Sequence, residues 1–496
     1  MMNLKTIAYL VIITIPIVYA LATIVYWNTH SNLYILTHID PILFSKNVKY
    51  PTIVYVATYT LNPFNKSKIL KIWEFGNLKI VKYIVDSVDE VKKLKSYLGV
   101  ESIMSMYRHV LLPEPLDKIM SMYVEKKLFE TIAIAVATGK DVKLEFHKIT
   151  WKYIGRNVTV CVIDTGVDYL HPDLRHSIKA LVSFRVFTEA GQPLLWVKGV
   201  NKTVLIHGKI INVSTLEGVW KFEQEVYLEV GEYPWMDTSS HGTHVIGIIA
   251  GSGVLSRGKV MGIAPGVEVV SIKVFNEKGY ASIDAILDSL EWLYKIGIDY
   301  LNIDVCSFSW GVEMSSDGSD PISLAVSKLI KDKGVIIVVA MGNSYIFPYT
   351  INVPAVCHGC IAVGAYDPFS NSITLFSSSG PTPDGRIKPD FVADGVWVLS
   401  TIPVTVTSYY ELLLRTYHLD DLLIYRGYAY MSGTSMATPI VAGFVAKIVE
   451  KYKILYGRKP TLEEVINELL HCTERINPFF KDIWSGWGYP REDWLR

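Results

Sequence analysis

The order of apolar and polar positions divides the chain into segments with different hydrophobic patterns. From Asn157 onward, nearly continuous apolar runs end in glycine or polar turns: "VTVCVIDTG", "VEVVSIKVF", "YLNIDVCSFSWG", "GVIIVVAMGN" and "CIAVGAY". Such runs are typical of parallel strands covered on both faces. Between them lie stretches with helical spacing, such as "SIDAILDSLEWLYKIG" and "SLAVSKLIKDKG". The pattern predicts an α/β domain over residues 151–490, built on a doubly wound, mostly parallel sheet with helices on both faces.

Two segments interrupt this alternation. Residues 185–235 contain the pieces "KTVLIHGKIINVS" and "FEQEVYLEVGEY", whose alternating residues are typical of β-hairpins. Residues 403–427 are rich in Tyr and Leu. We expect both to be insertions at the surface of the α/β domain.

A separate small unit precedes this domain, over residues 46–115. "PTIVYVATYT" and "LKIVKYIVDSV" are typical of strands, whereas "NKSKILKIWEF" has helical spacing of Ile69, Leu70 and Trp73. "DEVKKLKSYL" is a charged amphipathic helix, and "GVESIMSMYRHVLL" is a further strand. The order β-α-β-α-β predicts a small α+β domain, joined to the larger one by a linker over residues 116–150.

The first residues have a different character. No charged side chain occurs from Thr6 to Trp27, a length that can span a bilayer. Lys5 precedes the run and the next Lys or Arg is Lys46, so the positive-inside bias directs the rest of the chain out of the cytoplasm. The small-x-small site at residues 20–22 leaves cleavage open. We expect residues 1–28 to be a transmembrane anchor or a signal segment, and the protein to be extracytoplasmic, membrane-anchored or secreted.

Composition narrows the classes of partner. The chain has 496 residues, half of them hydrophobic, and its 48 basic residues balance its 48 acidic residues. No overall field therefore favours nucleic acid or acidic lipid. The five cysteines do not form a dense disulfide framework. "CHGC", Cys357 to Cys360, has metal or redox spacing, but no second CxxC completes a zinc site. A local disulfide or two packed thiols is expected.

Candidate chemistry lies where strands end and helices begin. Asp164 directly follows an apolar run, and Ser435 precedes an apolar helix with Pro439 expected in its first turn. A hydroxyl there would lie at a helix N-terminus, which favours negative charge. Asp164 and Ser435 could each also have a purely structural role, because Asp and Ser commonly cap helices. "SSHGTHVIG" adds His241 and His244, which are chemically suited to base catalysis, metal binding or a structural hydrogen bond.

Three ordered motifs resolve these choices: "VIDTGVDYLHPDL", "HGTHVIGIIAG" and "GTSMATPIVAG". Together with "MGIAPGVEVVSIKVF", "VAMGN", "FSSSGP" and "KPD", the stretch from Trp151 to Gly488 resembles the subtilases, the subtilisin-like serine proteases. The resemblance implies a serine endopeptidase that acts on protein or peptide substrates and needs no cofactor for catalysis. It makes Ser435 the nucleophile, His241 the general base and Asp164 its orienting partner. Asn343 and the Ser435 N–H would form the oxyanion hole.

The same resemblance identifies a substrate-binding strand. In "CSFSWG", it assigns Ser309, Trp310 and Gly311 to the wall of the specificity pocket, although Trp310 stands where smaller aliphatic residues are common. Asp394 also departs from the family, where Pro is usual. Calcium often stabilises subtilases. No loop here has EF-hand spacing, and "SSDGSD", residues 315–320, is only a faint candidate for a structural calcium site.

The small N-terminal unit resembles the inhibitory propeptide of many subtilases over residues 50–112. It would then be an intramolecular inhibitor, and a retained accessory domain is the alternative. Two other functions stay open: a catalytically silent subtilase-fold binding protein on a membrane stalk, and a zinc hydrolase using His241 and His244. The zinc hypothesis is disfavoured because paired zinc histidines are typically spaced i, i+4 with a Glu between them. His244 is instead expected to be a structural residue at the helix start.

Overall fold

The fold is taken from a computed structural model. It describes residues 38–45, 48–106, 110–111, 152–188, 191–200, 203–206, 209–419, 423–424 and 427–491. The predicted anchor or signal, residues 1–28, and the predicted linker, residues 116–150, lie outside the described residues. Across the ranges that are described, no helix is both long enough and apolar enough to cross a membrane.

A large, mostly parallel sheet forms the centre of the α/β domain. In the described part of the chain it has nine strands, in the order β16-β15-β14-β13-β6-β11-β7-β8, with β17 also paired to β15. The inner pairs are parallel, and β8 and β16 are antiparallel edges. The strands are β6 (Thr159–Asp164), β7 (Ile178–Phe187), β8 (Pro193–Val197), β11 (Glu268–Lys273), β13 (Val305–Phe308), β14 (Ile336–Ala340), β15 (Ile361–Asp367), β16 (Ser372–Ile373) and β17 (Phe391–Asp394).

Helices cover both faces of this sheet, which explains the nearly continuous apolar runs. On β6, Val160 and Val162 join the core that includes α5 (His241–Ala250) and α10 (Thr434–Tyr456). Cys161 and Ile163 point the other way, into the core that includes α6 (Ile283–Trp292) and α8 (Pro321–Lys333). Because both faces of such a strand are buried, both sets of alternate positions are mostly apolar. The predicted α/β architecture is confirmed.

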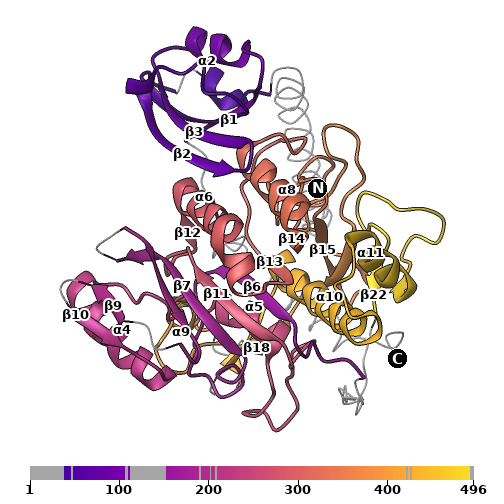
Figure 1. Ribbon diagram of the computed structural model, residues 1–496. Helices are drawn as coiled ribbons and strands as arrows, with labels where there is room; N and C mark the ends of the chain where they lie inside the picture. The colour runs from indigo at the N-terminus through magenta and orange to yellow at the C-terminus, as the bar shows by residue number, and fades with distance from the viewer. Residues whose placement is uncertain are drawn as a thin grey trace, which may run out of the picture.

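The small N-terminal domain is a four-stranded antiparallel sheet in the order β2-β3-β1-β4. Its strands are β1 (Thr52–Thr58), β2 (Ile69–Phe75), β3 (Leu78–Val85) and β4 (Val100–Ser105), and α2 (Val88–Lys95) begins after the N-cap Ser87. The helix expected from Ile69, Leu70 and Trp73 is wrong, because these residues lie in β2. Trp73 and Phe75 alternate into the core while Glu74 faces out, a period of two. Figure 1 shows this domain beside α6 and α8.

The first insertion, predicted over 185–235, combines a hairpin with a helix. β9 (Thr203–Ile206) and β10 (Lys209–Asn212) form the expected hairpin. "FEQEVYLEV", however, belongs to α4 (Leu216–Val230), so the second predicted hairpin is wrong. Its buried residues, Val219, Phe222, Glu223 and Val226, follow helical spacing. A buried Glu interrupts the apolar stripe, which is why the stripe is hard to recognise in the sequence.

The second insertion, predicted over 403–427, contains α9 (Tyr409–Thr416) and β19 (Leu423–Ile424). β19 lies beside β20 (Tyr428–Met431), which also pairs with β18 (Val398–Thr401). After α10 the chain forms α11 (Leu462–His471), which starts with a capping box between Thr461 and Glu464. The remaining short elements are η1 (Pro41–Phe44), η2 (Lys66–Lys68), β5 (Val110–Leu111), β12 (Tyr280–Ala281), η3 (Leu293–Gly297), α7 (Ile298–Tyr300), β21 (Thr473–Glu474) and β22 (Tyr489–Pro490).

Candidate active site

Asp164 and His241 meet at the carboxyl edge of the sheet. Asp164 is the last residue of β6 and His241 the first residue of α5. The Nδ1 atom of His241 lies 2.8 Å from Oδ1 and 3.0 Å from Oδ2 of Asp164. Both residues are buried. In this pairing Nδ1 donates its proton to the carboxylate, which leaves Nε2 as the basic nitrogen of the neutral ring.

A second buried carboxylate, Asp237, holds the start of the histidine helix. Its Oδ1 accepts from the N–H groups of Ser239 and Ser240 at 2.8 and 3.0 Å. Its Oδ2 accepts from the N–H and hydroxyl of Thr243 at 2.8 and 2.7 Å. Ser240 has a left-handed backbone, with φ of 96°, which is costly for a residue with a side chain and needs such support. Sequence reasoning missed Asp237, although its place just before the helix is a capping signal.

Thr165 connects the two carboxylates. Its N–H donates to Asp164 Oδ1 at 2.7 Å, and its hydroxyl lies 2.9 Å from Asp237 Oδ1 and 3.2 Å from Asp164 Oδ1. The same hydroxyl oxygen accepts from the N–H of Gly242 at 2.8 Å. The strand end that carries Asp164 and the helix start that carries His241 are therefore joined by direct hydrogen bonds.

Ser435 is the second residue of α10, which packs against α5 on the same face of the sheet. Its hydroxyl donates to the carbonyl of Ser309 at 3.0 Å, and the hydroxyl of Ser309 donates to the carbonyl of Ser435 at 3.0 Å. Pro439 lies beyond the first turn of α10, not within it as expected. Because proline has no N–H, the Ser435 carbonyl has no i+4 donor within the helix, and Ser309 supplies one.

Asn343 follows β14 and lies against the start of α10. Its Oδ1 accepts from the N–H and the hydroxyl of Thr434, both at 3.0 Å. These bonds fix the amide plane, so that the NH₂ group is on the side away from Thr434. Gly342, just before it, has φ of 101°, and a Cβ there would lie 2.4 Å from the side chain of Asn352. Only glycine fits this turn.

The predicted substrate strand follows β13 directly. Ser309 contacts Ser435, as described, and a Cβ on Gly311 would lie 3.0 Å from the Cβ of Asn352. Trp310 is fully buried, with its ring 5.4 Å from that of Phe308 and 6.4 Å from that of Phe275. The structure brings Ser309 to the start of α10, and the role of all three residues in a specificity pocket stays a prediction.

His244 is fully buried, and its Nε2 lies 3.0 Å from the carbonyl of Val398 and 3.1 Å from that of Ala429. Burial lowers the pKa of His244 to about 3, so the ring is neutral near pH 7. A nitrogen that donates to carbonyls is not available to bind a metal ion. The structure agrees with the expected structural role. Among the described residues, no group of three or more His, Cys, Asp or Glu side chains is arranged to hold a metal ion.

The carboxylates of the "SSDGSD" stretch have protein partners. Asp320 caps α8 by accepting from the N–H of Ser323 at 2.9 Å, and it accepts from the Ser316 hydroxyl at 2.6 Å. Asp317 accepts from the N–H of Ser319 and lies 3.0 Å from His38 Nε2 of the N-terminal domain. Both acidic residues therefore have protein hydrogen-bond partners, and a calcium ion at this stretch stays a prediction.

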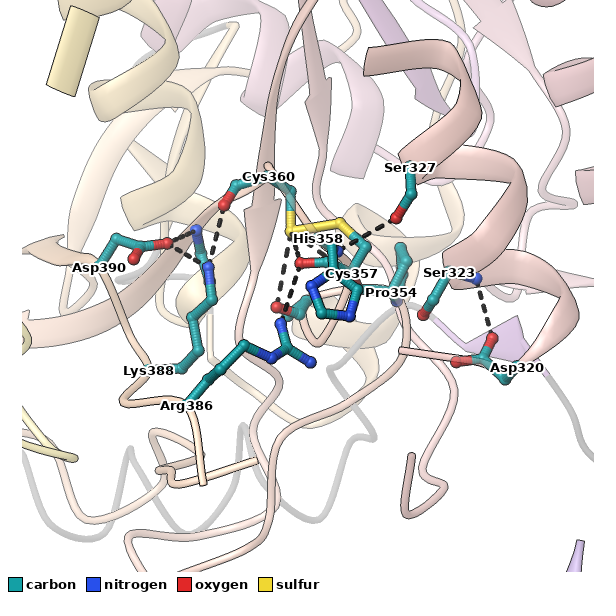
Figure 2. Close-up of a disulfide and its surroundings, with 12 residues drawn as sticks. Asp320, Ser323, Ser327, Pro354, Cys357, His358, Cys360, Arg386, Lys388 and Asp390 are labelled. Carbon is teal, nitrogen blue, oxygen red and sulfur yellow. Dashed lines mark hydrogen bonds and ion pairs between the residues drawn. A yellow bond between two sulfur atoms is a disulfide. The ribbon is translucent and has the colours of Figure 1, made fainter. Parts of the chain in front are cut away.

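Cys357 and Cys360 form a disulfide, which decides between the two alternatives left open by the sequence. Figure 2 shows it between α8 and a charged loop. The N–H of His358 donates to Ser327 Oγ on α8 at 3.1 Å. Lys388 donates to the Cys360 carbonyl at 2.9 Å. The disulfide and these two hydrogen bonds lie in the segment that leads into β15.

Asp394, which replaces the usual Pro, is the last residue of β17. Burial raises the pKa of its carboxyl, and a hydrogen bond from Tyr489 opposes that rise. The carbonyl of the next residue, Gly395, accepts from the N–H of Gly433 at 2.8 Å, just before Ser435. The loop at Asp394 thus supports the approach to α10.

Comparison with known proteins gives one consistent family. The sequence matches the subtilase family, Peptidase S8, over residues 155–474. It is 31% identical to the serine protease AprX of Bacillus subtilis over 357 residues, which covers 69% of this chain and 67% of that protein. It is 30% identical to subtilisin DY of Bacillus licheniformis, over 61% of this chain and 80% of that protein.

A solved structure shares the fold. Fervidolysin from Fervidobacterium pennivorans, a keratinolytic enzyme related to subtilisin, superposes with a TM-score of 0.58 at 21% identity. The match covers 91% of this chain and 61% of that one. Fold and sequence together define a serine endopeptidase. The chain belongs to the subtilase family.

Proposed function

We propose that this chain is an extracytoplasmic endopeptidase in which Ser435, His241 and Asp164 form the catalytic triad. The observation that carries the proposal is the buried contact of Asp164 with His241, beside a helix that presents Ser435 at its N-terminus. The helix N-terminus favours the negative charge that develops near this serine. The neutral His241 ring, protonated on Nδ1, presents the right nitrogen as a base.

The chemistry follows from these positions. Ser435 Oγ leaves the carbonyl of Ser309 and attacks the scissile carbonyl carbon, while its proton passes to His241 Nε2. The NH₂ group of Asn343 and the N–H of Ser435 stabilise the resulting oxyanion. The C–N bond then breaks, and His241 gives its proton to the departing amine. Water attacks the acyl-enzyme by the same route and releases the acid and Ser435.

Labelling with a fluorophosphonate tests this assignment. We expect a covalent adduct on Ser435 of the mature protein, and none in Ser435→Ala. Chelators should leave activity intact, because no cofactor takes part in these steps. A mature, folded protein without an adduct would contradict the triad and support the silent binding protein instead. Loss of activity on chelation that zinc restores would favour the zinc hydrolase.

A structural calcium ion is a separate proposal. The candidate residues are those of the "SSDGSD" stretch, residues 315–320. The test is thermal unfolding of the inactive Ser435→Ala protein with and without a calcium chelator. A lower melting temperature on chelation would support a calcium site.

Two observations support an extracytoplasmic location. Residues 6–27 carry no charge over a length that can span a bilayer. Cys357 and Cys360 are oxidised to a disulfide, a bond that persists mainly outside the cytoplasm. The proposal is tested by fractionating cells that express the full chain. Recovery of the protein in the cytoplasm would contradict it.

We propose further that the N-terminal domain is an inhibitory propeptide. After the domain, β5 pairs antiparallel with β12, with Leu111 opposite Tyr280 and Val110 opposite Ala281. β12 lies just before α6 and provides an open strand edge on the catalytic domain. A peptide added to such an edge is bound through its backbone, in the way that a protease holds a substrate. Residues 110 and 111 are therefore bound as an extended strand.

Opposite charges support the docking of this domain on α6. Lys82 Nζ lies 2.5 Å from Asp284, which also accepts from the hydroxyl of Tyr55 at 2.7 Å. Lys71 Nζ lies 2.5 Å from Asp288, which also accepts from the indole N–H of Trp73. One turn further, Glu291 accepts from the backbone N–H of Glu74 at 2.6 Å. These three acidic residues of α6, at i, i+4 and i+7, form one stripe that faces the domain.

A further inference from the structure

Both insertions contact the segment that leads to His241, residues 235–240. From the first insertion, α4 contributes a buried Glu223. From the second, the start of α9 donates the N–H groups of Tyr409 and Tyr410 to the carbonyls of Thr238 and Ser239, at 2.7 and 3.2 Å. The hydroxyls of Ser408 and Ser240 also share a hydrogen bond. The segment is therefore held by two parts of the chain that lie far from the triad in sequence.

Glu223 is fully buried, and three donors converge on its carboxylate. Oε2 accepts from the hydroxyl of Tyr169, and Oε1 accepts from the N–H groups of Trp235 and Met236, the latter at 2.9 Å. A buried carboxylate is costly unless such donors satisfy it. Burial raises the pKa of Glu223, while the three donors and the charge of Lys273 act against that rise. The position thus needs acceptor oxygens that match these three donors.

Lys273 holds the same segment from the other side. Its buried Nζ donates to the carbonyls of Tyr233 and Met236 at 3.0 and 2.6 Å. Lys273 ends β11 and lies in register with Asp164 on β6. The Glu223 side chain thus accepts from the N–H groups of the segment, and the Lys273 side chain donates to its carbonyls.

The donors to Glu223 come from both sides of the Asp164–His241 pair. Tyr169 belongs to the turn that follows Asp164, and Val167 in that turn donates its N–H to the Trp235 carbonyl at 3.2 Å. Trp235 and Met236 lead directly into Asp237, which caps the helix of His241. Glu223 therefore ties the turn after the strand to the segment before the helix.

We propose that Glu223 is a positioning residue for the Asp164–His241 pair, so that the first insertion takes part in catalysis through α4. The inference rests on the proposed roles of Asp164, His241 and Ser435. Without the carboxylate, the segment before His241 loses its fixed N–H contacts, and the imidazole loses its alignment. A displacement of about 1 Å at reacting groups can cost about 100-fold in rate.

The test compares Glu223→Ala with Glu223→Gln and with a matched control, Glu450→Ala. Glu450 is equally buried and also accepts two backbone N–H groups, from Ile154 and Gly155 at 2.6 Å each, but it lies far along α10 from Ser435. Each variant is measured by kcat and KM on a peptide substrate and by its rate of fluorophosphonate labelling. All rates are expressed per folded molecule. The folded fraction of each variant is taken from circular dichroism and its melting temperature.

We expect Glu223→Ala to lower kcat and the labelling rate by about 10- to 100-fold with KM little changed. Glu223→Gln keeps an acceptor oxygen for Trp235 and Met236, so its kcat should stay within about fivefold of the wild type. Glu450→Ala should keep the wild-type kcat per folded molecule. If Glu223→Ala does not fold, Glu223→Asp, which withdraws the carboxylate by one methylene, should lower kcat by about tenfold.

The failures of the two proposals are distinguishable. A wild-type protein that is not labelled at Ser435 would contradict the triad itself. The positioning role would be overturned if the wild type is labelled and Glu223→Ala is labelled at the same rate per folded molecule. The same holds for Glu223→Asp if it is used in place of Glu223→Ala. An equal loss of kcat in Glu450→Ala would also overturn it, because the effect would then reflect a general loss of packing.

Discussion

Residues of the same type have different properties in this protein because their partners differ. His241 and His244 lie one helical turn apart, yet one faces a carboxylate and the other two backbone carbonyls. A carboxylate stabilises the protonated ring that forms when a base accepts a proton, whereas deep burial among carbonyls keeps the ring neutral. The first arrangement is suited to base catalysis, and the second fixes a helix in the core.

Asn343 gives a prediction at this scale. Asn343→Ala should lower kcat by about 10²- to 10³-fold with KM little changed, because the amide would stabilise charge that exists only in the transition state. Asn343→Asp should be as slow, since a carboxylate cannot donate and adds negative charge. Steady-state kinetics check this, with Ser344→Ala as a control in the same loop. A kcat within fivefold of the wild type in Asn343→Ala would remove Asn343 from the oxyanion hole.

His244 gives a prediction about pH. Its pKa in the folded protein is about 3, below the value of about 6.5 for an exposed histidine. Between these values the unfolded chain binds more protons, so the free energy of unfolding falls as the pH drops below about 6.5, by at most about 1.4 kcal/mol per pH unit for this one group. His244→Gln keeps a donor near the Nε2 position and cannot take up the proton.

Urea unfolding of the inactive Ser435→Ala protein at pH 7 and pH 5 measures this effect without self-digestion. The double variant with His244→Gln should lose less stability between the two pH values than Ser435→Ala alone. Equal losses in the two proteins would mean that His244 is not responsible for the acid sensitivity.

At the scale of elements, helix starts determine the geometry of the site. α5 begins at His241 and α10 begins one residue before Ser435, and both starts lie at the ends of turns that a side chain or a glycine fixes. α6 has a different role, because its side that faces the N-terminal domain carries the acidic stripe of Asp284, Asp288 and Glu291. One helix thus packs an apolar face on the sheet and offers a charged face to the N-terminal domain.

The stripe on α6 predicts that the proposed inhibition by the N-terminal domain depends on salt. Screening weakens ion pairs as the Debye length falls from about 10 Å at 0.1 M to about 3 Å at 1 M salt. High salt should therefore shorten the lag before activity appears. Partly exposed pairs contribute about 0–1 kcal/mol each, so Lys71→Gln with Lys82→Gln should weaken docking by about tenfold and remove most of the salt dependence.

Progress curves of the full chain at 0.1 M and 1 M salt measure this lag. Lys92→Gln is a suitable control, because this exposed lysine lies on α2 and has only a weak contact to Asp89 in its own helix. A salt dependence that persists unchanged in the double variant would show that other charges control docking.

At the scale of the whole molecule, two separate cores are placed in contact. The N-terminal domain has its own apolar core around Val56, Tyr83 and Ile103, while Trp73 and Phe75 reach into the core that contains α6 and α8. The domain therefore packs on the catalytic domain through apolar side chains as well as charges.

Maturation follows as a prediction at this scale. Since β5 is bound along β12, we expect the chain to be cut after Leu111 and before Lys152, in the stretch that joins the domains. N-terminal sequencing of the mature protein should find its first residue there. Ser435→Ala should remain uncut. If the alanine variant loses the domain at the wild-type rate, another protease is responsible; a mature protein that keeps residues 38–106 would identify an accessory domain.

The α/β domain could be predicted because its strands are buried on both faces, which leaves an apolar run that few other structures produce. The N-terminal domain was harder. The residues of β2 are amphipathic in a way that fits a helix as well as a strand, and only pairing with β3 selects the strand. In α4, a buried carboxylate stands within the apolar stripe, so its helical period became visible only with its partners in place.

The sequence by itself determined the class of fold, the motifs with Asp164, His241, Ser435 and Asn343, and the apolar segment at residues 6–27, because these depend on local composition and order. Tertiary structure alone decided that Asp164 contacts His241 and that His244 is neutral. It also decided that Asp237 and Glu223 hold the segment that leads to His241. Those properties arise from groups that are distant in the chain and meet only when the sheet and its helices pack together. Burial there strengthens each hydrogen bond and each interaction between charges.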